Sequence, residues 1–233
     1  MAHCGGSASG QYCKTLTGTA VGTGWTELRP LLNAANLWVK AAFEDILAGL
    51  PFGMTGAHYD NGMEFVNWPL FTWCKENGIE VTRTRPYRKN DNCQRHICRA
   101  EQKNYDAERK TVGYFRYDTQ AECAALGEVY RWLCLLHNYW MPSFQLESKE
   151  KQEDGRYKKV YEKTPKTPYE RLLESPEVPA ESKAELMRRR AAQNPVELNR
   201  RLNEAVAGPL KLNREKQYAG ESSCQEGARA CAV

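Results

Sequence analysis

Hydrophobic and polar residues follow two different periods along the first 86 residues. The stretch 11–20 alternates and is rich in threonine, and 25–31 follows it after the turn Gly-Thr-Gly, which predicts an antiparallel hairpin. Between 33 and 50 the apolar residues recur at helical spacing. The elements expected next are a strand at 54–60, a helix at 64–77 and a strand at 79–86. This order indicates an α/β protein with a mixed sheet flanked by helices.

The second part of the chain is expected to be mainly helical. The expected elements are, in order, helices at 99–112 and 120–139, a polar and basic linker at 147–170, and helices at 180–192 and 195–212. The last fifteen residues are mostly small or polar, so we expect them to be disordered. We therefore divide the chain into a core at 1–145 and a basic linker with a helical tail at 146–233.

The charge balance permits a nucleic-acid partner without requiring one. The 33 Lys and Arg exceed the 29 Asp and Glu by only four. Basic residues cluster at 82–89, 149–159 and 187–190, and single clusters of this kind are usually solvated surface. With no secretory leader and no apolar run long enough to span a membrane, a cytoplasmic location and no membrane partner are expected.

The nine cysteines show no paired spacing, which favours reduced thiols. Those expected in or near the core are Cys74, Cys123 and Cys134. Cys93, His96 and Cys98 supply three zinc-binding residue types, but no fourth donor lies at a standard zinc spacing. A zinc site is therefore not expected.

Two carboxylates have both a structural and a chemical interpretation. Asp60 begins the triplet Asp-Asn-Gly, which is favourable turn chemistry. Glu101 lies in a predicted helix beside Lys103 and other basic residues, where a surface ion pair is the ordinary role. Carboxylates at the end of a strand and on a nearby helix are also the groups that hold a divalent cation. The residues by themselves leave both interpretations open.

Several longer stretches of the chain carry a family resemblance. They are LTGTAVGTGWTELRPL, DNGMEFVN, NGIEVTRTRPYRKND, EQKNYDAERKTVGYFRYDT, LHNYWMPSF and KTPKTPYERLL. In combination they resemble the integrase core of bacterial insertion-sequence transposases, relatives of retroviral integrase, over residues 3–215. The resemblance implies an RNase H-like fold and places Asp60 at the second catalytic aspartate and Glu101 at the catalytic glutamate.

The same resemblance implies the chemistry and the partners. Members of the family cleave and join DNA with two Mg²⁺ (or Mn²⁺) ions held by three carboxylates, so DNA strand transfer is the expected activity. The residues expected to contact DNA are Arg83, Arg85, Arg88, Lys89, Lys103 and Asn104. DNA, a homo-oligomeric state and a nucleoid-associated location are expected, and a small-molecule substrate is not.

The chain departs from the family pattern at two places. The family's first aspartate precedes the segment that begins at His3, and no Asp stands there. Forty residues separate Asp60 from Glu101, about five more than the family spacing, and the stretch QRHICRA accounts for the excess. These departures favour an N-terminally truncated transposase core that is not expected to cut or join DNA by itself. The alternative is a non-catalytic DNA-binding or oligomerising remnant that regulates an intact transposase.

Overall fold

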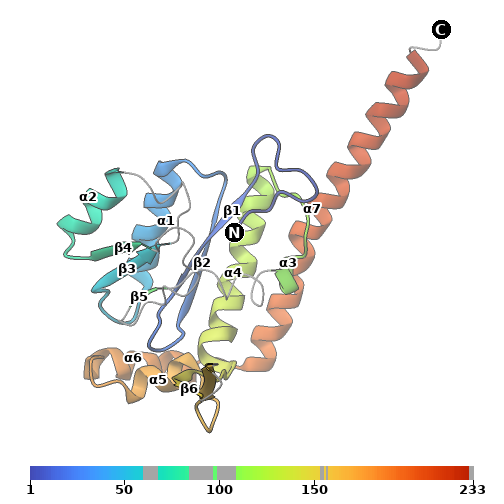
Figure 1. Cartoon of the computed structure of the whole chain (residues 1–233). Helices are drawn as coiled ribbons and strands as arrows, with labels where there is room; N and C mark the ends of the chain where they lie inside the picture. Colours follow the sequence, from blue (N-terminus) through green and yellow to red (C-terminus); the bar gives the residue numbers. More distant parts are fainter. Residues whose placement is uncertain (60–67, 84–96, 99–108, 153–154, 156, 231–233) are drawn as a thin grey trace.

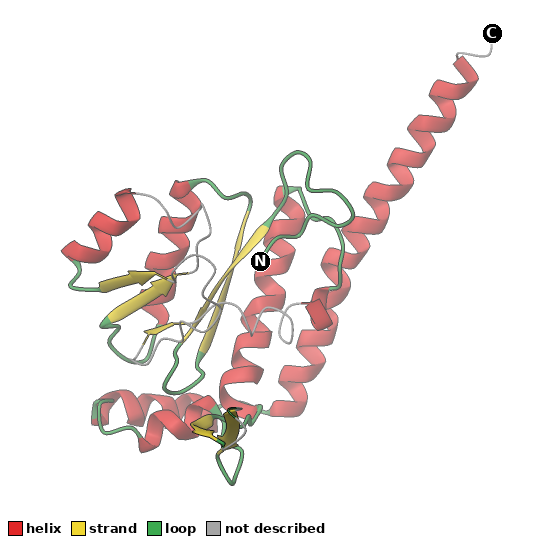
Figure 2. Ribbon diagram, in the orientation of Figure 1, coloured by secondary structure: helices red, strands yellow, loops and turns green. Residues whose placement is uncertain are grey.

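The structure is a computed structural model of the 233-residue chain, drawn in Figure 1 and, by secondary structure, in Figure 2. It describes residues 1–59, 68–83, 97–98, 109–152, 155 and 157–230. The statements that follow concern these residues.

An antiparallel hairpin of β1 (Lys14–Thr19) and β2 (Thr26–Leu31) lies between two helices. Leu16 and Leu31 pack with α1 (Asn36–Gly49), whereas Leu28 packs with α4 (Gln120–Trp140). Both faces of the hairpin are therefore covered, which suits its threonine-rich, β-branched sequence. The predicted strands at 11–20 and 25–31 and their antiparallel pairing are confirmed.

A second sheet is parallel and has the order β4-β3-β5, with β3 (Gly56–Tyr59) in the centre. β4 (Glu80–Arg83) pairs with one edge of β3, and the two-residue β5 (Ile97–Cys98) pairs with the other. α1 and α2 (Trp68–Glu76) pack on this sheet through a shared apolar cluster. The helix at 33–50 and the strand at 54–60 agree with the sequence prediction to within a few residues.

The predicted single mixed sheet is not what the described residues form. Within the residues listed above, the hairpin β1-β2 and the parallel sheet β4-β3-β5 are separate hydrogen-bonded units. The two units share one core, because Leu16 of β1 and Ala57 of β3 belong to the same apolar cluster. The general α/β class is correct, and the RNase H-like arrangement stays a prediction.

The long helix α4 begins with a complete capping box. The Thr119 hydroxyl accepts a hydrogen bond from Glu122 N at 3.1 Å, and the Glu122 carboxylate accepts one from Thr119 N at 3.0 Å. Further along, Asn138 donates to Thr26 O and accepts from Thr26 N, both at 2.8 Å, so its amide pairs with the backbone of β2. The apolar stripe expected here is buried, from Leu126 to Leu133.

The segment expected to be a basic linker contains a β-hairpin instead. β6 (Leu146–Lys151) pairs antiparallel with β7 (Tyr157–Tyr161), and α5 (Pro168–Glu174) follows. The sequence predicted a linker here because these two segments lack the apolar alternation that marks a strand packed on a core.

The helical tail packs on the core rather than forming a separate unit. α6 (Ala180–Ala191) contributes the buried Leu186 to an apolar cluster with Trp25 and Tyr139. α7 (Pro195–Ala230) lies along α4, and its Leu202 is buried there. Tertiary contacts therefore cross the division expected at residue 145.

The last helix, α7, extends into the segment that was expected to be disordered. α7 runs to Ala230, so most of the last fifteen residues are helical. Ion pairs one turn apart support this helix, such as Lys211 and Glu215, whose charged atoms lie 3.9 Å apart at i,i+4 spacing. Figure 1 shows the C-terminal part of α7 extending beyond the body of the chain.

Helix 99–112 of the sequence prediction lies almost wholly outside the described residues. Its last part is seen as α3 (Lys110–Val112), a single turn. Of the cysteines expected in or near the core, Cys74 and Cys134 are buried and Cys123 is half-buried, as expected. In the described part of the chain, no helix has both the length and the apolar character needed to cross a membrane.

Candidate functional site

One residue of the predicted site is among those the structure describes, namely Arg83. The predicted residues outside the described ranges are Asp60, Arg85, Arg88, Lys89, Glu101, Lys103 and Asn104. The Cys93–Cys98 cluster lies outside them as well, apart from the backbone of Cys98 in β5. The candidate site is therefore built from the strands that lead into these segments.

The carboxyl ends of β3 and β4 lie side by side. The two strands are parallel, and the register pairs Tyr59, the last residue of β3, with Arg83, the last residue of β4. The Arg83 side chain is exposed at this edge. Asp60 is the next residue in the chain after Tyr59. The carboxyl edge of a parallel sheet is where open α/β sheets bind their ligands.

Packing on both faces fixes the register of this strand pair. On one face Ala57 is buried against the apolar cluster of α1 and α2, and Val81 packs beside it. On the other face His58 Nδ1 and Thr82 Oγ1 are 2.9 Å apart, within hydrogen-bond distance. A one-residue slip would exchange these faces, so the position of Arg83 relative to Tyr59 is well determined.

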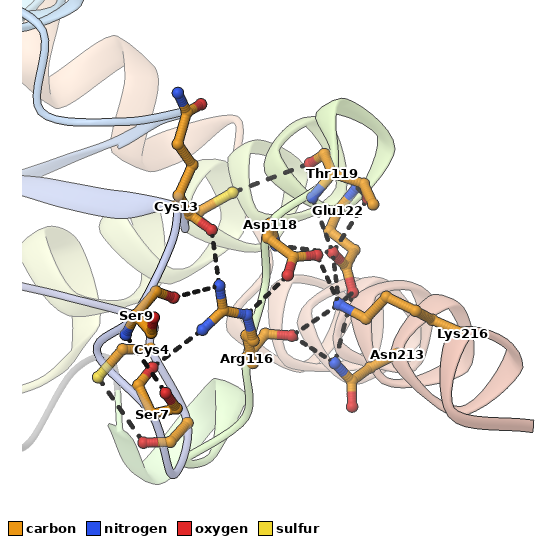
Figure 3. A network of polar contacts seen from close by, with 12 residues as sticks. Cys4, Ser7, Ser9, Cys13, Arg116, Asp118, Thr119, Glu122, Asn213 and Lys216 are labelled. Carbon is orange, nitrogen blue, oxygen red and sulfur yellow. Dashed lines mark hydrogen bonds and ion pairs between the residues drawn. The ribbon is translucent and has the colours of Figure 1, made fainter. Parts of the chain in front are cut away.

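A second cluster of charged residues joins α4, α7 and the N-terminal segment (Figure 3). Glu122 is 1% exposed and accepts hydrogen bonds from Lys216 Nζ at 2.9 and 3.1 Å. Lys216 also contacts Asp118 at 2.9 Å, and Asp118 pairs with Arg116 at 2.7 Å. Each acid thus has a basic partner from a different part of the chain.

The electrostatics of this cluster indicate a structural role. Burial alone would raise the pKa of Glu122, but the hydrogen bonds from Lys216 and from the backbone at Asp118 and Thr119 lower it below its usual value. Burial likewise opposes the charge of Lys216, and the hydrogen bonds to Glu122 and Asp118 outweigh it and raise the pKa of the amine. A carboxylate and an amine held ionised in contact are poor proton-transfer groups at neutral pH.

Local sequence patterns do not reveal this cluster, although they contain part of its signal. Thr119 and Glu122 form the pattern Thr-x-x-Glu that marks a capping box at a helix start. The second partner, Lys216, is 94 residues further along the chain. No local pattern connects residues so far apart, so the tertiary structure was needed.

The basic cluster at 187–190 is largely engaged in internal contacts. Arg189 pairs with Glu185 at 2.8 Å, and Arg188 contacts the same carboxylate. The Arg190 guanidinium lies 4.0 Å from the ring centroid of Trp140 and donates a hydrogen bond to a backbone carbonyl. This cluster is therefore less available for phosphate than its sequence suggests.

Among the described residues, no group of three or more His, Cys, Asp or Glu side chains is placed to hold a metal ion. The residues expected to hold Mg²⁺, Asp60 and Glu101, lie outside those residues. The metal expectation thus stays a prediction.

No family model matches the chain. The uncharacterized protein y4rM of Sinorhizobium fredii (strain NBRC 101917 / NGR234) is 39% identical over 149 residues. The match covers 64% of this chain and 41% of that protein, so this chain spans about two fifths of the length of its relative.

A solved structure also resembles the chain. The catalytic core domain of BIV integrase matches with 19% identity and a TM-score of 0.40, covering 69% of this chain and 85% of that one. A TM-score this low does not establish a shared fold.

Proposed function

We propose that this chain is the core of an integrase-type transposase that takes part in DNA strand transfer. The observation that carries the proposal is the meeting of the β3 and β4 carboxyl ends, where the exposed Arg83 lies beside Tyr59 and the chain continues into Asp60. The family motifs listed above add support. They contain Asp60, Arg83 and Glu101 at the positions that the resemblance assigns to the site.

The residues proposed to act directly are Asp60 and Glu101. Their carboxylates are hard oxygen donors, which suits Mg²⁺ or Mn²⁺. When bound, such ions stabilise the attacking and leaving oxygens of an in-line displacement at phosphorus. The resemblance calls for a third carboxylate upstream of His3. The relative y4rM is longer than this chain, so a longer protein is tested as well.

Arg83 is proposed to position the DNA rather than to react. Its exposed guanidinium lies where β3 leads into Asp60, and it can bind a backbone phosphate without reading the base sequence. The basic residues expected to extend this contact are Arg85, Arg88, Lys89 and Lys103, with Asn104 beside them. Binding through phosphates predicts an affinity that falls steeply with salt.

A second candidate function shares the DNA but not the chemistry. The exposed Arg83 can bind a backbone phosphate without any metal chemistry, so the chain can also be proposed to bind DNA without cutting it, as a regulator of an intact transposase. Such a protein would form complexes with DNA or with a complete copy. It would show no metal-dependent nicking.

The two functions are separated by a nicking and strand-transfer assay on supercoiled plasmid with Mg²⁺ or Mn²⁺. The assay compares this chain with a version extended upstream by its genomic codons, each with and without Glu101→Gln. Glu80→Gln is the matched control, because Glu80 is an exposed acid at the opposite, amino end of β4. We expect activity in the extended protein that Glu101→Gln abolishes and Glu80→Gln leaves unchanged.

Arg83 is tested by DNA binding in the same proteins. Arg83→Gln should lower the affinity for duplex DNA and reduce the slope of log affinity against log salt by about 1. Lys75→Gln is its control, since Lys75 is an exposed base in the last turn of α2. DNA binding with no nicking in any version would favour the regulator. The absence of both DNA binding and nicking would contradict both functions.

A further inference from the structure

Two cysteines that the proposed site does not use meet where β1 and α4 begin. Cys13, directly before β1, is 0% exposed, and Cys123, near the start of α4, packs against the same apolar cluster. The Cys13 thiol lies 3.8 Å from Thr119 O, within hydrogen-bond distance for sulfur (Figure 3). Cys123 N donates to the same carbonyl at 3.0 Å. One backbone carbonyl therefore contacts both cysteines, and both are free thiols in the structure.

The two thiols also interact with each other. A side-chain hydrogen bond between Cys13 and Cys123 is the largest influence on both groups, raising the pKa of the Cys13 thiol and lowering the pKa of the Cys123 thiol. Burial and the nearby carboxylates of Glu122 and Asp118 raise the pKa of Cys13 further. In this pair the Cys13 thiol keeps its proton and donates it, and the Cys123 sulfur accepts the hydrogen bond.

The pair is asymmetric in exposure as well as in acidity. Cys13 is fully buried, whereas Cys123 is half-buried and so has part of its surface in solvent. The thiolate, not the thiol, attacks an oxidant, so a thiol with a lowered pKa and some exposure reacts first. An exposed cysteine of this kind beside a second thiol is the arrangement found where a cysteine is oxidised reversibly.

Other described cysteines have different surroundings and serve as controls. Cys134 is buried in the same apolar cluster, further along α4. Cys74 is buried in the separate cluster shared by α1 and α2. The Cys4 thiol lies 3.7 Å from the carbonyl of the next residue, Gly5.

We propose that Cys13 and Cys123 form a redox-active dithiol, which a peroxide converts into a disulfide between the start of β1 and the start of α4. The Cys123 thiolate attacks one oxygen of hydrogen peroxide and the O–O bond breaks, which leaves a sulfenic acid on Cys123 and a hydroxide that takes up a proton to become water. The sulfur of Cys13 then attacks the Cys123 sulfur, an S–S bond forms, and the proton of Cys13 leaves with the hydroxyl group as a second water. Two thiols are oxidised to one disulfide and one peroxide is reduced to two waters.

The disulfide closes a long loop of the chain. The residues between Cys13 and Cys123 include the β1-β2 hairpin, α1 and the β3-β4 edge. A disulfide stabilises a folded protein by restricting its unfolded chain, and the effect grows with the length of the closed loop. Oxidation should therefore raise the midpoint of thermal unfolding by about 10 °C, and dithiothreitol should reverse the shift.

Peptide mapping identifies which cysteines pair. The reduced protein is treated with hydrogen peroxide, the remaining thiols are blocked with N-ethylmaleimide, and the protein is digested with trypsin and chymotrypsin. Cleavage after Tyr12 separates Cys4 from Cys13, which otherwise share a tryptic peptide. We expect a species linked through Cys13 and Cys123 that is two hydrogen atoms lighter than the reduced peptides together. Cys123 linked to Cys4 or Cys134 instead would overturn the proposal.

Substitutions separate the two chemical steps. Cys13→Ala removes the second thiol, so the sulfenic acid should persist on Cys123 and react with dimedone, whereas in the wild-type chain the disulfide consumes it. Cys123→Ala should abolish both the cross-link and the rise in thermal midpoint. Cys134→Ala removes a buried thiol of the same cluster and should leave both unchanged. Thermal melts of the reduced proteins establish that each variant folds, and Cys123→Ala, at a half-buried position, decides the test if Cys13→Ala does not fold.

Three results would contradict this inference. Oxidation of Cys123 to a sulfinic acid without a cross-link would overturn the pairing. Dimedone labelling of Cys13→Ala at a cysteine other than Cys123 would overturn the assignment of the reactive thiol. A cross-link that leaves the thermal midpoint unchanged would overturn its stabilising role. Because none of these measurements involves DNA, each result leaves the function proposed for the β3-β4 edge standing.

Discussion

Protonation of the buried His3 is expected to destabilise the folded chain. His3 is 2% exposed, and its Nε2 lies 2.7 Å from Thr15 Oγ1 and 3.1 Å from the hydroxyl of Tyr130. Burial disfavours the charged imidazolium and lowers the pKa of His3 from 6.5 to about 4. The folded state therefore holds the ring neutral at pH values where the unfolded chain binds a proton.

The sign and size of the effect follow from linkage. Above pH 6.5 His3 is neutral in both states, so its full contribution to stability is present. As the pH falls below 6.5 the unfolded chain gains a proton first, and stability falls by about 1.4 kcal/mol for each pH unit until the folded pKa near 4 is reached. The total is about 3 kcal/mol, of which about 2 kcal/mol is lost between pH 7.5 and 5.

Urea unfolding of the wild-type chain and of His3→Gln at pH 7.5 and pH 5 measures this contribution. Glutamine keeps a donor and an acceptor at this position but does not titrate in this range. Every other titrating group is common to the two proteins, so the difference between their unfolding free energies isolates His3. That difference should shrink by about 2 kcal/mol from pH 7.5 to 5. A difference that is independent of pH would refute a buried, neutral His3.

Two further predictions concern ion pairs that tie the C-terminal helices to the core. Glu162→Gln removes the ion-pair partner of the buried Arg171 and should lower the unfolding free energy by about 3 kcal/mol. Glu174→Gln breaks the exposed pair with Lys166 and should cost less than about 1 kcal/mol. Urea unfolding compares the two variants, and equal losses would contradict the role of burial. Lys216→Met should lower the unfolding free energy by about 2 kcal/mol and speed proteolysis within α7, since it removes the cation hydrogen-bonded to the buried Glu122. An unchanged cleavage rate would show that this ion pair does not hold α7 on the core.

Much of the secondary structure could be predicted from local sequence. The helix from Asn36 to Gly49 and the helix from Gln120 to Trp140 lie where apolar residues recur at helical spacing, and each buries the expected stripe. The hairpin of β1 and β2 follows equally from alternation around a glycine-containing turn. These elements are predictable because each buries one side against a core, and burial leaves a period in the sequence.

The β6-β7 hairpin is an element that this periodicity does not predict. Its strands face solvent, so they have no apolar alternation and resemble a linker. Two contacts hold the hairpin in place. Arg171 of α5 pairs with Glu162, directly after β7, and Gln145 donates a hydrogen bond to Val21 O in the turn between β1 and β2. Such contacts depend on the folded chain.

The candidate site divides in the same way. Asp60 and Glu101 were identified from the resemblance of the surrounding motifs, and their placement stays a prediction. The structure added the neighbour relation of Arg83 to Tyr59, which depends on the parallel register of two strands 24 residues apart in the chain.

Local periodicity and capping residues predicted the hairpin of β1 and β2 and the helices α1 and α4, because these signals act over a few positions. Folding alone brings the buried Glu122 to Lys216 and places Arg83 beside Tyr59. The physical reason is range. Ion pairs and strand registers join residues far apart in sequence, and their energy depends on a burial and a geometry that exist only after the chain has folded.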